Sequence, residues 1–421
     1  MSARAGDPQD VLELKNEIRK LIDETQESDG DGDLELFRNI EEDWSSCARL
    51  SSGIYIILYR FSSMFWRALL HLPPLLGLVS AASDAAGSTY TDSTAVNFFI
   101  AISLFVVSFA VTAGALVLGA ALVRNSAAPP TSARDMKGKT VIVTGANSGI
   151  GYETALDIAR RGARVVMACR NTETAAKARE EIAEKTKNSN VVVKKLDLSS
   201  LKSVREFAAD INKNESRLDV LVHNAGMANT FEKKVTEDGL EITMATNMYG
   251  PFLLTHLLID LLKKSKPSRI VIVASDLYKL ANLDLENPNP INSLPAYLYY
   301  VSKRGNILWA RELSRRLEGS GVTANFLHPG MIDSGIWRNV PFPLNLPLKV
   351  IVKVFFKTPE KGAQTTVHLA VSDELDDVNG KYFMDCREHS LTSSVQDVGR
   401  EKRFWEICET MVKLTPSDPR I

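Results

Sequence analysis

Short runs of β-branched and apolar residues alternate with amphipathic stretches from about Met136 to the end of the chain. Apolar runs of about four to eight residues are typical of strands buried on both faces, and apolar residues three and four apart are typical of helices. The runs predict strands at Thr140–Val143, Arg164–Ala168, Val191–Leu196, Asp219–Val222, Arg269–Ala274 and Val322–Leu327. The amphipathic stretches predict helices between them, for example at Tyr152–Arg161, Glu173–Lys187, Leu201–Asn212 and Ala296–Leu317. This alternation indicates an α/β domain over residues 136–421, with a doubly wound parallel sheet covered by helices on both faces.

The chain before this domain has a different pattern. Residues 1–50 are acidic, and we expect them to be partly disordered. Residues 95–123 form a run of 29 positions without a charged side chain, which is long enough for a helix to cross a bilayer. We therefore expect an N-terminal helical membrane-anchor region at residues 51–124, ahead of the α/β domain.

A second apolar segment precedes the expected span. Residues 54–82 are rich in apolar and aromatic side chains, but they contain Arg60 and Arg67, and two adjacent prolines interrupt them. The segment fits either a second span or a helix that lies in the membrane interface. Residues 125–135 contain two further prolines and several small polar residues, so we expect a linker there.

The charges on either side of the expected span indicate its orientation. Arg124, Arg134, Lys137 and Lys139 follow the span, whereas no Lys or Arg lies between residues 72 and 94. Since segments rich in Lys and Arg stay in the cytosol, we expect the large domain to face the cytosol. We expect the membrane to be that of the endoplasmic reticulum.

The composition narrows the class of partner. The chain has 50 Lys and Arg against 51 Asp and Glu, so it lacks the basic surplus of a nucleic-acid-binding protein. The four cysteines are far apart and the six histidines are scattered. Neither a disulfide framework nor a metal site is expected from such spacing.

Three glycines follow the first predicted strand directly. Gly145, Gly149 and Gly151 have the spacing G-x-x-x-G-x-G, and a helical pattern begins at about Tyr152. A strand, a glycine turn and a helix N-terminus together place backbone N–H groups against a phosphate, and glycine lets the ligand approach the backbone closely. The turn therefore predicts a nucleotide-binding site.

The ends of the second and third strands bear on the choice of nucleotide. In NAD-preferring folds of this kind, an acidic side chain roughly 20 residues after the glycines bonds the ribose 2′-hydroxyl. Arg170 ends the second strand here, and arginine would pair with a 2′-phosphate instead. The sequence therefore predicts NADP(H) in preference to NAD(H). Asp197, at the end of the third strand, fits either a contact to adenine or a cap on the next helix.

The residues that could carry acid–base chemistry lie later in the chain. Tyr299 and Lys303 are four residues apart on a predicted helix and so share a face. A free tyrosine has a pKa near ~10, and a nearby ammonium would lower it toward the range that a general acid–base needs. Ser275 ends the fifth strand and could donate to a carbonyl oxygen or cap a turn. Asn247, within a predicted helix, could hold a water leading to Lys303 or could be an ordinary surface residue.

Taken in order, these residues resemble the short-chain dehydrogenase/reductase family, over roughly Met136 to the C-terminus. The resemblance rests on Thr144–Gly151, Asn224–Gly226, Asn247, Ser275, Tyr299 with Lys303, and Pro329-Gly330. Further features, including Ala168–Asn171 and Leu327–Gly330, resemble the retinol dehydrogenase branch. The family's fold is the Rossmann fold, which agrees with the strand and helix pattern.

The resemblance implies a role for each residue. Tyr299 would be the catalytic acid–base, Lys303 would lower its pKa and hold the nicotinamide ribose, Ser275 would polarise the carbonyl, and Asn247 would support the proton relay. The residues implied to bind the cofactor are Gly145, Asn147, Ser148, Gly149, Ile150, Gly151, Arg170, Asp197, Leu198, Asn224, Ala225, Gly226, Tyr299, Lys303, Pro329, Gly330 and Ser334.

Three positions depart from the family pattern. His223 stands where the family often has Asn, Ala274 stands where serine is usual in this branch, and Ser334 stands where threonine is typical. The N-terminal extension, residues 1 to about 90, has no recognised counterpart.

The leading hypothesis is a membrane-anchored, NADP-dependent oxidoreductase that reduces a lipophilic aldehyde or ketone, with retinaldehyde as the example. The alternatives are a reductase of steroids or other lipid carbonyls, and a catalytically silent dinucleotide-binding membrane scaffold. Family members are often dimers or tetramers, so a homo-oligomer is an open expectation.

Overall fold

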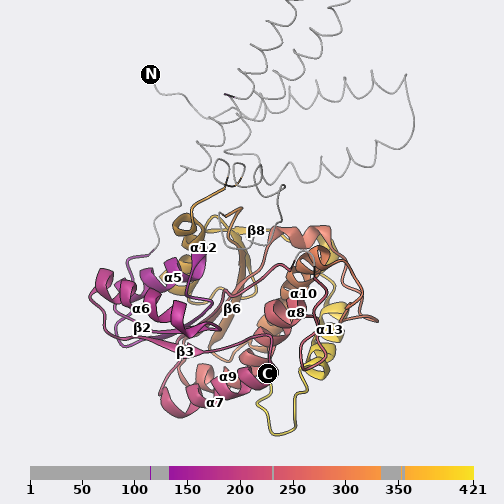
Figure 1. The fold of residues 1–421 in the computed structure, drawn as a ribbon, viewed down its shortest axis with the longest axis horizontal. Helices are drawn as coiled ribbons and strands as arrows, with labels where there is room; N and C mark the ends of the chain where they lie inside the picture. The colour runs from indigo at the N-terminus through magenta and orange to yellow at the C-terminus, as the bar shows by residue number, and fades with distance from the viewer. Residues whose placement is uncertain (1–113, 115–131, 230–231, 333–351, 353–355) are drawn as a thin grey trace, which may run out of the picture. The chain divides into compact units, whose positions relative to one another are not determined.

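The computed structural model describes residues 132–229, 232–332 and 356–421, together with Gly114 and Val352 (Figure 1). Apart from Gly114, the expected acidic region, both expected membrane segments and most of the expected linker lie outside the described residues. Within the described part of the chain, no helix is long and apolar enough to cross a membrane. The N-terminal membrane anchor therefore stays a prediction.

The described residues form a sheet of eight strands in the order β3-β2-β1-β4-β5-β6-β7-β8. The first seven strands along the chain pair in parallel, and β8 pairs antiparallel with β7. The strands are β1 (Thr140–Thr144), β2 (Arg164–Cys169), β3 (Val191–Lys195), β4 (Val220–His223), β5 (Ser268–Val273), β6 (Val322–His328), β7 (Tyr382–Met384) and β8 (Arg387–His389). The six strands predicted from the sequence are confirmed, each to within one residue at either end.

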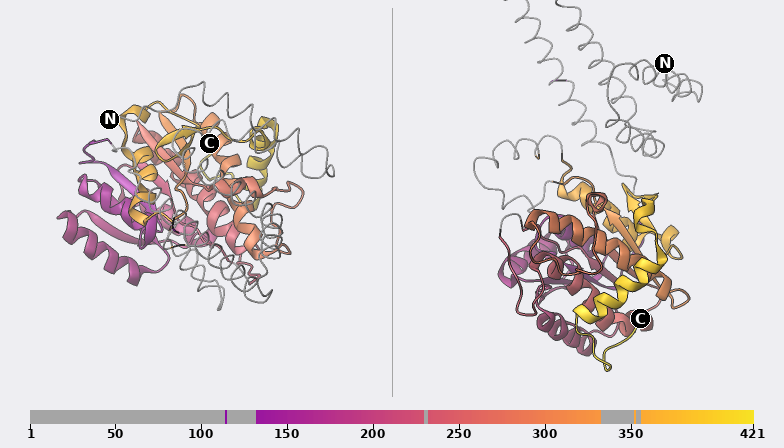
Figure 2. Two further views of the ribbon diagram at one scale, coloured as in Figure 1. Left: turned by 90° about the horizontal axis from the view of Figure 1, so that it is seen from above. Right: turned by 90° about the vertical axis from the view of Figure 1, so that its right-hand side faces the viewer.

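Helices cover both faces of the sheet, as predicted (Figures 1 and 2). On one face, Ile158, Ile182 and Val367 of three helices share a buried core with Val143 of β1. On the other face, Phe252 and other residues of four helices share a core with Ile142 of β1. The first set is α5 (Gly149–Arg160), α6 (Thr172–Thr186) and α12 (Pro359–Val371), and the second is α7 (Leu201–Asn214), α9 (Gly250–Lys264), α10 (Pro295–Arg316) and α13 (Val398–Met411).

Polar caps fix where several of these helices begin. Asn171 accepts a hydrogen bond from the N–H of Thr174 at the start of α6, and Ser200 accepts from Ser203 at the start of α7. Such caps satisfy N–H groups that have no partner within the helix. Because β1, β2 and β3 are parallel and α5, α6 and α7 follow them in turn, these helices all start at the carboxyl edge of the sheet, where ligands bind in doubly wound folds.

Helix α10 is the element that matters most for the candidate chemistry, and α13 holds it in place. Glu401 of α13 is fully buried and accepts hydrogen bonds from Arg311, at 2.7 Å, and from Arg315 of α10. Trp405 of α13 packs on Phe252 of α9, with ring centroids 4.7 Å apart. These contacts hold α13 against the C-terminal part of α10 and against α9.

Candidate active site

The glycine turn after β1 has a backbone shape that glycine adopts without strain. The φ angle is 66° at Gly145 and 59° at Gly149, in the left-handed region. Gly145 also lies close to the turn after β4, since a β-carbon on it would be 3.0 Å from the Cα of Ala225. A β-carbon on Gly151 would collide with the side chain of Asn224 and with the carbonyl of Gly145. A side chain at any of the three positions would therefore disturb the turn.

The N-terminus of α5 has the features of an anion site. Ser148, its N-cap, makes no side-chain hydrogen bond to the first turn, and the first turn contains no acidic residue. The first N–H groups of a helix have no partner within it, and the helix dipole adds positive potential there. A β-carbon on Gly149 would meet no described atom within 4 Å, so this side of the turn is open. The backbone fits a phosphate of a dinucleotide.

Thr144 connects the glycine turn to the end of β4. Its hydroxyl accepts the N–H groups of Asn224 and Ala225, each at 3.0 Å, and donates to the carbonyl of Val222 at 3.3 Å. The Asn224 side chain in turn donates to the carbonyl of Thr144 at 2.9 Å. Asn224 and Ala225, implied to bind the cofactor, therefore hold the turn in shape.

The residues near the second and third strands lie at the same edge. Arg170 is exposed at the end of β2, and no described residue forms an ion pair with it. Asn147 donates to the hydroxyl of Thr174 at 3.1 Å. Asp197 accepts from the N–H and the hydroxyl of Ser199, at 3.0 and 2.6 Å. These bonds form a turn ahead of α7, whose cap is Ser200, so the capping alternative for Asp197 is wrong and the adenine contact stays a prediction.

Two further predicted cofactor residues are packed against helices. Leu198 is buried, and its carbonyl lies so close to Gly250 that a β-carbon there would collide with it. Ile150 faces α12, since a β-carbon on Gly362 would be 3.4 Å from the Cγ1 of Ile150. Leu198 therefore packs against α9, and Ile150 against α12.

Ser275 and Tyr299 meet at the carboxyl end of β5. Ser275 is buried, and its hydroxyl accepts the N–H of Leu277 at 3.3 Å as the cap of the short helix η2 (Asp276–Leu280). Its side chain also lies beside that of Tyr299, near the start of α10, and acts to lower the pKa of Tyr299. The capping use left open by the sequence is therefore observed. It does not exclude donation to a carbonyl, because a hydroxyl both accepts and donates.

Lys303 lies beside this pair. Its Nζ is 5.6 Å from the centre of the Tyr299 ring and donates to the carbonyl of Val273 at 2.8 Å. Its side chain is buried, and a β-carbon on Gly226 would lie 3.6 Å from Nζ. The structure therefore brings together Ser275, Tyr299 and Lys303 from two elements.

Asn247 lies in a π-helical turn, η1 (Ala245–Tyr249), between the short helix α8 (Ile242–Met244) and α9. Its Oδ1 accepts the N–H of Met227, and its Nδ2 donates to the carbonyl of Met227, both at 2.8 Å. Nδ2 also donates to the hydroxyl of Ser302 at 3.0 Å. Asn247 is buried, so the surface alternative is wrong. Both amide N–H donors are used within the protein, so any water held by this side chain would have to donate to Oδ1.

The electrostatics of the Tyr299 hydroxyl differ from the expectation that Lys303 lowers its pKa. Burial raises the pKa of Tyr299 to about 12, and the neighbouring Ser275 side chain opposes this rise. Burial also lowers the pKa of Lys303 to about 8. Desolvation penalises the charged form of both groups. At neutral pH this site therefore holds a protonated tyrosine beside a lysine that is mostly charged.

The turn after β6 contains the last predicted cofactor residues. Pro329 and Gly330 follow directly, and φ at Gly330 is 93°. The N–H of Lys357 donates to the carbonyl of Met331 at 2.8 Å. Ser334 lies outside the described residues, so its role stays a prediction.

The sequence of this chain is similar to those of known proteins of one family. The sequence profile described as short chain dehydrogenase matches residues 139–342. Retinol dehydrogenase 14 of Mus musculus is 45% identical over 290 residues, which cover 66% of this chain and 86% of that protein. Retinol dehydrogenase 13 of Homo sapiens is 41% identical over 310 residues, which cover 72% of this chain and 92% of that protein. The chain belongs to the short-chain dehydrogenase/reductase family, in its retinol dehydrogenase-like branch.

A solved structure supports the same family fold. A protein from Mycobacterium paratuberculosis is 31% identical, with a TM-score of 0.53, over 67% of this chain and 97% of its own. As a member of the short-chain dehydrogenase/reductase family, this protein is an oxidoreductase that acts on an alcohol or carbonyl group. The Rossmann-like fold predicted from the sequence is confirmed.

His223 is buried in the interior of the domain. It stands where the family often has Asn. Its Nε2 is 2.8 Å from the hydroxyl of Thr255, and that hydroxyl donates to the carbonyl of Pro251 at 2.9 Å. Nε2 must therefore donate the hydrogen. Burial lowers the pKa of His223 to about 3, so the ring is neutral. His223 supports β4 and has no catalytic contact among the described residues.

Two polar residues of this short-chain dehydrogenase site were missed by sequence reasoning. Thr144 belongs to the glycine motif, and its hydroxyl joins β1 to the turn after β4. Ser302 adjoins Lys303, and its hydroxyl donates to the carbonyl of Tyr299 at 2.7 Å while accepting from Asn247. The spacing of Ser302, three residues after Tyr299 on a helix, was the signal that could have identified it.

Proposed function

We propose that this protein is a membrane-anchored, NADP-dependent oxidoreductase that reduces a lipophilic aldehyde or ketone, of which retinaldehyde is the example. The observation that carries the proposal is the meeting of Ser275, Tyr299 and Lys303 at the carboxyl edge of the sheet. An oxidoreductase of this family needs a proton donor and a hydrogen-bond donor at the carbonyl oxygen, and these side chains can supply both.

The cofactor and the protein side chains would have different roles in the reaction. NADPH, when bound, supplies the hydride that adds to the carbonyl carbon. Tyr299 then gives its phenolic proton to the carbonyl oxygen, and the Ser275 hydroxyl donates a hydrogen bond to the same oxygen. Lys303 is held by the carbonyl of Val273, where its ammonium stabilises the phenolate that Tyr299 becomes.

The state of Tyr299 is that of a proton donor. With a pKa of about 12, the phenol keeps its proton at neutral pH. Reduction of a carbonyl requires a proton donor, whereas oxidation of an alcohol requires the phenolate as base. The buried, protonated tyrosine is in the state that reduction uses, and an excess of NADPH over NADP⁺ in the cytosol would set the net direction toward reduction.

Arg170 supports the choice of NADP(H). Its guanidinium stands exposed beside the start of α6, and no described acidic side chain pairs with it. A 2′-phosphate carries negative charge and fits the forked donors of arginine. A ribose 2′-hydroxyl offers arginine no such charge.

The proposal also includes the arrangement of the whole chain. We assign residues 1–50 to an acidic region, 51–124 to a membrane region, 125–135 to a linker and 136–421 to the catalytic domain. The uncharged run at 95–123 supports a membrane anchor, and the basic residues after it support a catalytic domain that faces the cytosol at the endoplasmic reticulum. The names of the related proteins, retinol dehydrogenases, support a substrate that partitions into lipid.

The test is NADPH consumption by membranes that carry the full chain, with all-trans-retinaldehyde as substrate and NADH in a parallel assay. We expect turnover with NADPH that exceeds turnover with NADH. Turnover with a steroid ketone but not with retinaldehyde would show that the substrate is a steroid and not a retinoid. NADPH binding without turnover on any lipid carbonyl would contradict the enzymatic proposal and favour the scaffold.

A further inference from the structure

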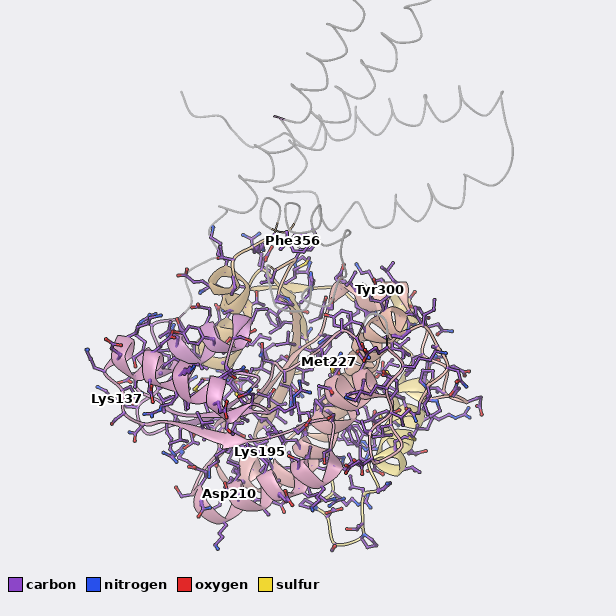
Figure 3. The ribbon with its side chains drawn as sticks, in the orientation of Figure 1. Lys137, Lys195, Asp210, Met227, Tyr300 and Phe356 are labelled. Atoms are coloured by element: carbon purple, nitrogen blue, oxygen red, sulfur yellow. The ribbon has the colours of Figure 1, made fainter. Side chains whose placement is uncertain are left out.

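The turn after β6 is joined to a residue far along the chain. Lys357 donates its N–H to the carbonyl of Met331 at 2.8 Å, and it forms a parallel bridge with Ile332. Phe356, the residue before Lys357, lies on the same side of the domain as Tyr300, opposite Asp210 of α7 (Figure 3). Lys357 therefore lies at the edge of the sheet that carries the candidate site.

The side chain of Lys357 makes two further contacts there. Its stem packs over Gly330, since a β-carbon on that glycine would be 3.2 Å from the Lys357 Cδ. Its Nζ forms an ion pair with Asp385, in the turn between β7 and β8. The Lys357 side chain is 18% exposed and that of Asp385 is 57% exposed. The pair thus ties the Pro329–Ile332 turn to the β7–β8 hairpin.

The hairpin turn is itself fixed in position. Both Asp385 and Cys386 have positive φ, 50° and 60°, and the N–H of Cys386 donates to the hydroxyl of Thr365 in α12 at 3.2 Å. Asp385 therefore presents its carboxylate from a defined point, so the ion pair can fix the position of Lys357.

Several charged side chains, including both members of this pair, surround His328. His328, the last residue of β6, is close to Asp276 and Asp385, whose charges raise its pKa, and to Lys357 and Lys279, whose charges lower it. Asp276 directly follows Ser275 in the chain. Burial is the largest influence and lowers the pKa of His328 to about 4, so the ring is neutral at neutral pH.

We propose that Lys357 and Asp385 act as a latch that positions the Pro329–Ile332 turn for the nicotinamide end of the cofactor. The inference rests on the proposed function, because it takes from the family resemblance that this turn cradles the nicotinamide. Neither residue of the latch touches reacting atoms, so both are positioning residues. The latch acts through the backbone of Met331 and Ile332 and through the stem of Lys357 over Gly330.

The experiment is a double-mutant cycle on the full chain in membranes. Lys357→Met keeps the apolar stem and removes the charge, and Asp385→Asn keeps a residue that tolerates positive φ. Each variant should raise the KM for NADPH roughly fivefold, the upper range for a partly exposed pair, with kcat changed less than twofold. The double variant should resemble either single variant, because the interaction can be lost only once.

The same hairpin offers a matched control pair. Lys381 and Glu388 form an ion pair of 2.8 Å across β7 and β8, with side chains 49% and 53% exposed. Lys381→Met and Glu388→Gln should leave the KM for NADPH within twofold of the wild type. Thermal melting of every variant checks that the fold is retained.

Three results would overturn the latch: an unchanged KM in both latch variants, an equal rise in the control variants, or single-variant effects that multiply in the double variant. If Lys357→Met does not fold, Asp385→Asn alone decides, because its side chain is more than half exposed. Fluorescence titration of the wild type with NADPH separates the two proposals. Absence of NADPH binding would contradict the proposed function and the latch together, whereas normal binding with unaltered variants would contradict the latch alone.

Discussion

Replacing Arg170 by alanine should weaken NADPH binding while leaving NADH binding and the fold unchanged. Arg170 is exposed at the end of β2 and has no described ion-pair partner. Its replacement therefore leaves no described acidic side chain without a partner. Exposed substitutions of this kind change the free energy of unfolding by at most about 0.5 kcal/mol. Any larger effect on NADPH must therefore come from a lost contact to the cofactor.

The magnitude follows from the chemistry of the expected contact. A hydrogen bond to a charged group contributes about 1.5–3 kcal/mol, and solvent screening at this exposed site favours the lower end. A loss of about 1.5 kcal/mol raises the Kd for NADPH roughly tenfold. Arg170→Asp should go further and favour NADH, because an aspartate would repel the 2′-phosphate and accept from a 2′-hydroxyl.

The assay is fluorescence titration of the wild type and the variants with NADPH and with NADH, at low and at high salt. Arg160→Ala is the matched control, since Arg160 is also exposed but lies at the far end of α5, away from the glycine turn. The Arg170 effect should shrink as salt rises. An unchanged ratio of the two Kd values in Arg170→Ala would refute the reasoning.

Three further changes test the supports of the site. Asn247→Ala leaves the N–H and carbonyl of Met227 without partners and should lower the free energy of unfolding by about 2–4 kcal/mol, measured by urea denaturation. Gly151→Ala forces a side chain into the glycine turn and should raise the Kd for NADPH at least roughly tenfold, whereas Gly399→Ala should not. The pKa of His223 is lowered to about 3 in the folded protein, so the unfolded chain binds an extra proton as the pH falls below about 6.5 and stability is lost. As the pH falls below about 6, the free energy of unfolding of His223→Asn should therefore decrease less steeply than that of the wild type, by about 1 kcal/mol per pH unit.

The sheet and its helices were predictable because their residues satisfy local rules. The β-branched run Val141–Val143 is completely buried, as a central strand of a parallel sheet requires. The strands β7 and β8 were not predicted, because each has three residues, too few for a periodic pattern. β7 forms through pairing with β6, and β8 through pairing with β7, and the first of these is a tertiary interaction.

The identity of the site residues was predictable from motifs, but their environment was not. Spacing alone indicated that Tyr299 and Lys303 share a helix face, and the structure places them together. The pKa of Tyr299 is raised instead of lowered because burial outweighs the neighbouring groups, and burial depends on the packing of the whole domain. For the same reason, the hydrogen bond from Asn247 to Ser302 could be known only from the structure.

The central claim, that Tyr299 is the proton donor of a carbonyl reductase, has a matched control in the neighbouring residue. The rings of Tyr299 and Tyr300 are 6.1 Å apart, but it is the Tyr299 side chain that lies beside Ser275 and Lys303. The most direct measurement is NADPH-dependent reduction of retinaldehyde by membranes carrying Tyr299→Phe or Tyr300→Phe. The account predicts that kcat falls at least roughly hundredfold in Tyr299→Phe, with NADPH binding retained, and stays near the wild-type value in Tyr300→Phe. Equal turnover by the wild type and Tyr299→Phe would contradict it.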